Sequence, residues 1–167
     1  MNNKYESLPK IVELLDGFHT AMLVTHSGGR GLRARPMAIA NLGLDAQLKF
    51  ITDIETSKVI EVEMEQHCLV VCQKEGGIYL DMEGIATVSQ DREEIDALWK
   101  EPFKIYFPDG KDDPSICIIH FRPERVEYWD NSGLNKLAFF WEAAKAYVSG
   151  TLIVTDNNPQ QHGVLQL

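Results

Sequence analysis

The chain has 167 residues, 44% of them hydrophobic, and a formal net charge of −9, which are typical of one globular domain with a proper core. No apolar run approaches the ~20 residues that span a bilayer, and the first ten residues lack the apolar core of a signal peptide. An acidic chain also binds nucleic acid poorly, because phosphate contacts dominate that affinity. We therefore expect a cytoplasmic protein with neither a membrane nor a nucleic-acid partner.

The predicted elements alternate short strands with a few helices. Helices are expected near residues 8–16, 57–66, 91–100 and 137–148, and the strands near 20–26, 33–40, 47–52, 68–74, 78–89, 115–121 and 125–129. Short turns between the strands favour an antiparallel barrel over a βαβ fold. We predict a mainly β (α+β) fold, a barrel of about six strands with flanking helices. It forms one domain over residues 1–155, followed by a C-terminal tail over 156–167.

Cysteine and histidine usage gives no metal signature. Cys68, Cys72 and Cys117 are odd in number and lie in apolar strands, which favours buried, reduced thiols. Cys68 and Cys72 would share one face of a strand, so a metal pair is conceivable. No further ligands lie nearby, and the five histidines show no metal-binding spacing. We predict no metal site.

A basic segment interrupts this acidic chain. No acidic residue occurs between Asp16 and Asp45, whereas Arg30, Arg33 and Arg35 all lie there. A local excess of arginine in a chain of negative net charge indicates a binding site for a small anion.

The strand expected at 33–40 has two unlike faces, because side chains alternate along a strand. One face carries Arg33, Arg35, Met37 and Ile39, and the other carries Ala34, Pro36, Ala38 and Ala40. The second face is small enough for a flat ligand to approach the backbone. Pro36 cannot donate to a ladder, which places this strand at an edge or a bulge.

A helix is expected to begin at Ser57 and Lys58, shortly after the strand at 47–52. Its first amides, the hydroxyl and the ammonium suit a phosphate, which the neighbouring arginines could also bind. The alternative is that Ser57 only caps the helix and the arginines are solvated. The side chains of Arg35 and Lys58 are expected to be exposed without ligand, and the acidic set Glu61, Glu63 and Glu65 to form a solvated helix face.

Five motifs in order, RARPMAIA, FITDIETSK, IYLDMEGIATV, YFPDGKDDPS and RVEYWD, resemble the FMN-binding split-barrel family related to pyridoxamine 5′-phosphate oxidase. The general stress protein branch of that family matches best. The resemblance implies an antiparallel split barrel, FMN as the cofactor, and a homodimer with the flavin at the subunit interface.

The resemblance also implies the flavin contacts, residue by residue. They are Arg35, Pro36, Met37 and Ala38 along the flavin, Thr52 and Asp53 beside the ring, Ser57 and Lys58 at the phosphate, Tyr79 near the ring, and Trp129 from the other subunit. Arg33 joins this set because it shares a strand face with Arg35. Trp129 has an alternative role as the end of a core strand in its own subunit. The aromatic residues Trp99, Phe103, Tyr106 and Phe107 are expected to serve core or dimer packing rather than cofactor binding.

The chain departs from the oxidases of this family at two places that bear on activity. The oxidases carry a substrate-binding lysine where this chain has Ala40, and an R-L-H-D-R motif where it reads NSGLNKLAFF from Asn131. Both argue against vitamin B6 oxidation. Two hypotheses remain: an FMN-dependent oxidoreductase of unknown substrate, or a non-catalytic protein that binds or senses flavin.

Overall fold

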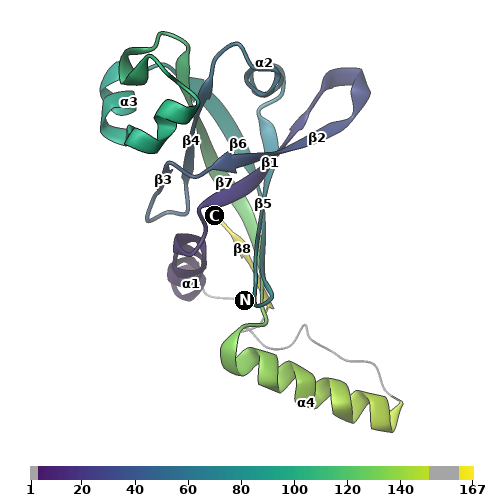
Figure 1. Cartoon of the computed structure of the whole chain (residues 1–167). Coiled ribbons are helices and arrows are strands. Elements are labelled where there is room, and N and C mark those ends of the chain that lie inside the picture. Colours follow the sequence, from purple (N-terminus) through teal and green to yellow (C-terminus); the bar gives the residue numbers. More distant parts are fainter. Residues whose placement is uncertain (1–3, 151–161) are drawn as a thin grey trace.

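A computed structural model describes residues 4–150 and 162–167, and within them the chain forms an eight-stranded antiparallel sheet with four α-helices (Figure 1). The strands are β1 (Thr20–His26), β2 (Leu32–Ala38), β3 (Asn41–Leu42), β4 (Leu48–Asp53), β5 (His67–Lys74), β6 (Ile78–Ser89), β7 (Ile116–Asp130) and β8 (His162–Gln166). The helices are α1 (Lys4–Asp16), α2 (Ser57–Met64), α3 (Arg92–Leu98) and α4 (Gly133–Ser149), with 3₁₀ turns η1 (Gly28–Arg30), η2 (Glu101–Ile105) and η3 (Gly110–Asp112).

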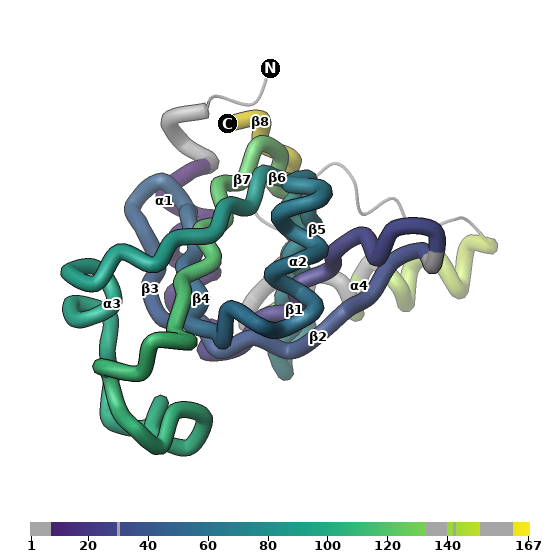
Figure 2. Tube along the Cα trace, turned by 90° about the horizontal axis from the view of Figure 1, so that it is seen from above, coloured from purple at the N-terminus to yellow at the C-terminus, as the bar shows by residue number. Residues whose placement is uncertain are grey.

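The sheet curls into a barrel, and the strands β2 and β4 come together at only one of their ends (Figure 2). Its strand order is β2-β1-β5-β6-β7-β4-β3, with β8 added beside β7. Just after β2, the amide of Ala40 donates to the carbonyl of Lys49 at 2.8 Å, which joins the two ends of the sheet. Further along, β2 and β4 diverge and leave a split between them.

The core fills the inside of this barrel. Alternate residues of each strand point inward, and the largest fully buried side chains include Leu23, Phe50, Leu80, Met82 and Phe121. A smaller cluster, Ile95, Phe107, Ile116 and Ile118, packs under α3. Asp91 begins α3 as predicted, because its carboxylate accepts from the amides of Glu93 and Glu94.

The predicted strands at 115–121 and 125–129 are in fact one strand, β7, which pairs with β6 through a bulge at Glu83 and Gly84. Gly84 is required there, since a Cβ at this position would lie 2.2 Å from the carbonyl oxygen of Arg122. A glycine inside a strand is typical of such a bulge with close backbone approach.

Two strands were not predicted, so the count of about six was too low. β3 has only two residues, too few for a periodic signal. β8 lies in the segment predicted as a tail, yet it pairs with β7 from Trp129 to Arg125. Residues 156–161 of that segment lie outside the described residues.

The helix predicted over 137–148 is α4, which begins four residues earlier and extends away from the barrel (Figure 1). Phe140, Trp141, Tyr147 and Val148 on it are exposed. No helix in the described part of the chain is long and apolar enough to cross a membrane.

The three cysteines are buried free thiols, as predicted. Burial raises the pKa of Cys68 to about 11, of Cys72 to about 12 and of Cys117 to about 11. Within residues 4–150 and 162–167, no group of three metal-binding side chains comes together.

Candidate functional site

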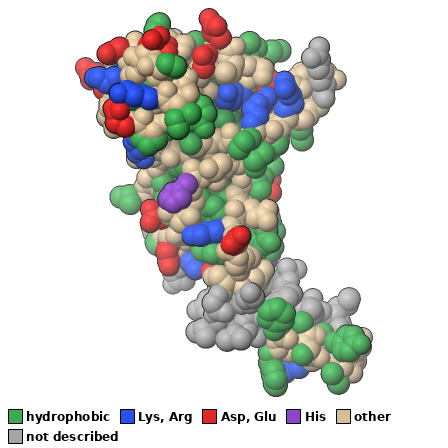
Figure 3. Space-filling model, viewed as in Figure 1, with side chains coloured by type: hydrophobic (Ala, Val, Ile, Leu, Met, Phe, Trp, Pro, Cys, Tyr) green, Lys and Arg blue, Asp and Glu red, His purple; other side chains and the backbone are tan. Residues whose placement is uncertain are grey.

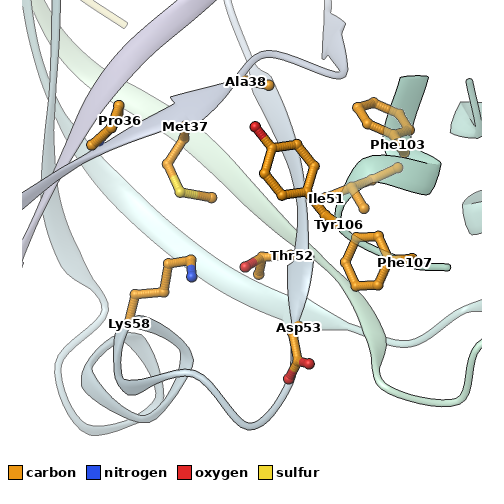
Figure 4. Close-up of a pocket in the computed structure, with 10 residues that line it drawn as sticks. All are labelled: Pro36, Met37, Ala38, Ile51, Thr52, Asp53, Lys58, Phe103, Tyr106 and Phe107. Carbon is orange, nitrogen blue, oxygen red and sulfur yellow. The ribbon is translucent and has the colours of Figure 1, made fainter.

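The split between β2 and β4 is a pocket with one polar and one aromatic wall (Figure 4). It is lined by Pro36, Met37, Ala38, Ile51, Thr52, Asp53, Lys58, Phe103, Tyr106 and Phe107. Six of these were predicted as site residues: Pro36, Met37 and Ala38 from β2, Thr52 and Asp53 from β4, and Lys58 from α2. The sequence places them together because β2 stays on the sheet edge while the chain turns from β4 directly into α2.

The turn after β4 sets where α2 begins. The carboxylate of Asp53 accepts from the amide of Glu55 at 2.7 Å, and the Thr56 hydroxyl donates to the Asp53 carbonyl at 2.7 Å. Thr56 is the N-cap residue, but its hydroxyl accepts from none of the first amides of α2, and the Val59 amide donates to the Thr56 carbonyl instead at 3.0 Å. The proposed capping role of Ser57 is therefore wrong, and Ser57 lies within the first turn.

Lys58 extends from that first turn into the pocket, toward Met37 (Figure 4). Partial burial and, after it, the positive charge of Arg35 lower the pKa of the Lys58 ammonium. Asp53 counteracts this only in part. A half-buried ammonium beside a guanidinium is a local excess of positive charge, which a bound anion would relieve.

Arg33 and Ser57 line a second hollow next to the first, together with Ser27, Gly28, Ile60, Glu61 and Met64. Arg35 lines neither hollow but lies between them, because its guanidinium pairs with Glu61 of the second hollow and its charge acts on Lys58 of the first. Lysine and arginine side chains gather over this part of the molecule, between α2 and the base of β2 (Figure 3). The basic segment of the sequence thus meets the start of α2, as the anion-site hypothesis requires.

Arg35 is not the exposed side chain that the sequence suggested. Its guanidinium forms a salt bridge with Glu61 and donates to the Thr25 hydroxyl at 2.6 Å, and only 17% of its side chain is accessible. Glu61 is likewise buried, which overturns the expectation that Glu61, Glu63 and Glu65 form one solvated face. Burial alone would raise the pKa of Glu61, but hydrogen bonds from Thr25 and Arg35 and the charges of both arginines lower it below its usual value.

Tyr79 and Trp129 lie away from this pocket. They are cross-strand partners on β6 and β7, whereas Thr52 pairs with Cys117 at the other end of β7. Trp129 is twelve residues beyond Cys117, about 40 Å at ~3.3 Å per residue. Trp129 stacks on His162 of β8 with ring centroids 5.3 Å apart, outside both core clusters. Within one chain, neither aromatic can contact a ligand held in the split.

Five residues were missed as site residues: Thr25, Ile51 and Glu61, and the aromatics Phe103 and Tyr106. Phe107 belongs to the small core cluster and Phe103 packs against it, so the expected packing role of both is confirmed, although both also line the pocket. Three aromatics within a turn-rich loop were a usable signal for Phe103 and Tyr106. Thr25 could have been found from the hairpin, since its register places it opposite Arg33.

An antiparallel barrel with a split beside a cluster of cationic side chains defines the split-barrel class of ligand-binding folds. The chain belongs to the pyridoxamine 5′-phosphate oxidase-like family, whose model matches residues 6–153. It is 27% identical over 128 residues to general stress protein 26 of Bacillus subtilis, covering 74% of this chain and 89% of that protein.

Solved structures agree on the fold. A candidate general stress protein 26 from Jannaschia sp. CCS1 superposes with a TM-score of 0.73 at 24% identity, over 98% of this chain and 99% of that one. The general stress FMN/FAD binding protein from Xanthomonas citri gives 0.67 at 20% identity, over 77% of this chain and 92% of its own. The predicted split-barrel fold and family are therefore confirmed.

Proposed function

We propose that this chain is a flavoprotein that binds FMN in the split, with the ring in the pocket and the phosphate at Arg33, Arg35, Ser57 and Lys58. One observation carries this proposal: the pocket with its aromatic wall also contains the half-buried ammonium of Lys58, on which the charge of Arg35 acts. A flat ring can lie against Pro36 and Ala38, whose side chains are small. The binding of FMN or FAD by the structural neighbour from Xanthomonas citri supports the same ligand class.

The residues present fit this cofactor. Tyr106 and Phe103 supply aromatic surface on one side of the pocket, and the Thr52 hydroxyl points into it as a hydrogen-bonding group (Figure 4). Lys58 supplies charge where the pocket meets the start of α2. Bound flavin supplies the redox chemistry itself, by accepting and donating a hydride.

The first test is cofactor binding. The protein should purify yellow, with one FMN per subunit, and riboflavin should bind more weakly because it lacks the phosphate. Lys58→Ala should weaken FMN binding about ten- to a hundredfold, since a charged hydrogen bond contributes roughly 1.5–3 kcal/mol. A colourless protein whose flavin fluorescence titration with FMN is flat would refute the proposal.

We infer that the flavoprotein is an oxidoreductase, with a substrate other than pyridoxamine phosphate. Rapid reduction of bound flavin by NADPH, NADH or a reduced deazaflavin, followed by catalytic reoxidation, would support this. Bound flavin that none of these donors reduces would favour a non-catalytic flavin-binding protein instead. The free thiols support a cytoplasmic location as part of the same proposal.

The proposal includes a homodimer that shares each flavin site. The outer face of the sheet, from β2 across to β8, remains accessible, with Met22 37% and Tyr79 40% exposed. Its apolar residues are Met22, Val24, Pro36, Leu69, Val71, Tyr79 and Trp129, and they share the face with the charged residues Asp81, Glu83, Arg125 and Glu127. A two-fold partner would cover it and would bring Trp129 to the pocket of the other subunit.

Asp81 supports such a partner. It lies in the middle of this outer face, between Val71 and Glu127, and its Oδ1 is buried without a hydrogen-bond partner in the described residues. Burial and, after it, the charge of Glu83 raise the pKa of Asp81. A buried acceptor without a partner is costly, so an ordered water or a donor from a second subunit would complete it.

Mixed subunits test the shared site. Lys58→Ala and Trp129→Ala subunits, refolded together, should form heterodimers in which one of the two sites has both native residues. Flavin affinity should therefore recover in part of the mixture. No recovery, or sedimentation of the FMN-loaded native protein as a monomer, would contradict the shared site.

A further inference from the structure

A carboxylate is buried inside the cationic cluster. Glu61 lies one turn after Lys58 on α2, and its side chain is only 9% accessible. Its carboxylate accepts from Arg35 and from the Thr25 hydroxyl at 2.6 Å, and it lies 3.4 Å from the guanidinium of Arg33. Electrostatically, a negative charge here opposes any incoming phosphate, so its presence calls for another explanation.

The two arginines beside Glu61 differ in burial and in how firmly they are held. Arg33 is 55% accessible and only loosely paired, whereas Arg35 is 17% accessible and donates to Glu61, to the Thr25 hydroxyl and, at 3.5 Å, to the Arg33 carbonyl. Thr25 is completely buried, and its hydroxyl accepts from Arg35 while it donates to Glu61. The three groups form a closed triangle that fixes the guanidinium of Arg35 between the two hollows.

Fixing an arginine before the ligand arrives removes a cost from binding. A free arginine side chain loses much rotamer freedom when it closes on an anion. Arg35 has already lost that freedom in the folded protein, and three of its five donors are used by Thr25, Glu61 and the Arg33 carbonyl. The other two donors have no acceptor among the described residues and are free for a ligand.

We propose that Glu61, with Thr25, is a positioning residue that orients Arg35 for the phosphate of the flavin and so sets the preference for FMN over riboflavin. This inference rests on the flavin site proposed above. It predicts the direction in which FMN affinity changes. Removal of the Glu61 charge should weaken FMN binding, although simple electrostatics would strengthen it.

The experiment compares FMN and riboflavin titrations, followed by flavin fluorescence, for the native protein and Glu61→Gln. The matched control is Glu63→Gln, which removes the same charge from an exposed position on the same helix. Glu61→Gln should weaken FMN binding about tenfold, the scale of one charged hydrogen bond partly lost. Riboflavin binding should stay within about twofold of native, and Glu63→Gln should change neither ligand.

Thr25→Val tests the same triangle without any change of charge, and it covers the case in which Glu61→Gln does not fold. It should reduce the ratio of FMN to riboflavin affinity, and Thr25→Ser should restore that ratio. Unchanged or tighter FMN binding by Glu61→Gln would overturn the inference and make Glu61 a counter-ion only. Equal weakening of both ligands would overturn it too, as structural damage.

These outcomes separate the two proposals. If the native protein binds no FMN, both the proposed function and this inference are refuted. A native protein that prefers FMN, with variants that keep the same preference, removes this inference alone.

Discussion

Arg35 and Lys58 are both cations of the candidate phosphate site, but the structure predicts that only the replacement of Arg35 lowers the stability of the ligand-free protein. Arg35→Met keeps most of the apolar stem and removes the partner of the buried Glu61 carboxylate. Loss of one partner from a fully buried ion pair costs about 3–5 kcal/mol. Arg33 at 3.4 Å and the Thr25 hydroxyl remain near Glu61, so we expect a smaller loss of about 2–3 kcal/mol in the free energy of unfolding.

Lys58→Met is the matched control. Among the described residues, Lys58 forms no salt bridge within 4.0 Å, and it is half-buried, so its replacement should change stability by less than about 0.5 kcal/mol. Urea unfolding without flavin measures both variants. With a slope of about 2 kcal/mol per M, Arg35→Met should lower the midpoint by about 1–1.5 M. Equal midpoints for the two variants would refute the buried Arg35–Glu61 pair.

Four further predictions follow from the same structure. Gly84→Ala should destabilise the fold by about 3 kcal/mol in urea unfolding, because its Cβ would overlap the Arg122 carbonyl, while Gly29→Ala, with open space around it, should not. The pKa of Glu61 in the folded protein lies below its usual 4.5, so its charge stabilises the fold above pH 4.5 and this contribution is lost as the pH falls through the folded pKa. The free energy of unfolding, measured in urea between pH 7 and pH 3, should therefore fall less in Glu61→Gln than in the native protein. Tyr106→Ala should weaken FMN and riboflavin binding alike in fluorescence titrations, by about tenfold, since in the proposed complex Tyr106 would contact the flavin ring and not the phosphate. Pyridoxamine phosphate should give no steady formation of pyridoxal phosphate, because the buried Ala40 offers no cation for the substrate.

The strand-helix layout around β2, β4 and α2 could be predicted because each element has a local cause. Pro36 excludes a central strand, and the chain from Asp53 to Lys58 contains its own turn and helix start. These elements bring together six of the residues that the resemblance implied as flavin contacts. The resemblance to a known family supplied the cofactor, which no local pattern could identify.

Glu61 could not be predicted, because its burial depends on which helix face meets the barrel. Glu61, Glu63 and Glu65 are all glutamates, so the sequence does not tell them apart. Only the contacts with Thr25 and Arg35 distinguish Glu61. β8 was missed for a similar reason, since five residues gain their strand structure by pairing with β7. Such long-range contacts leave little trace in local periodicity.

The three buried thiols give this protein a set of natural reporters. With pKa values of about 11, 12 and 11, Cys68, Cys72 and Cys117 have well under ~0.1% thiolate at neutral pH, and the thiolate is the reactive form. Oxidants and alkylating reagents should therefore leave the folded chain unmodified. Labelling must wait until β5 or β7 opens, so the labelling rate at each cysteine measures how often that strand separates from its neighbours. Mass spectrometry of the labelled peptides would read out the opening of the barrel at three points, without any engineered probe.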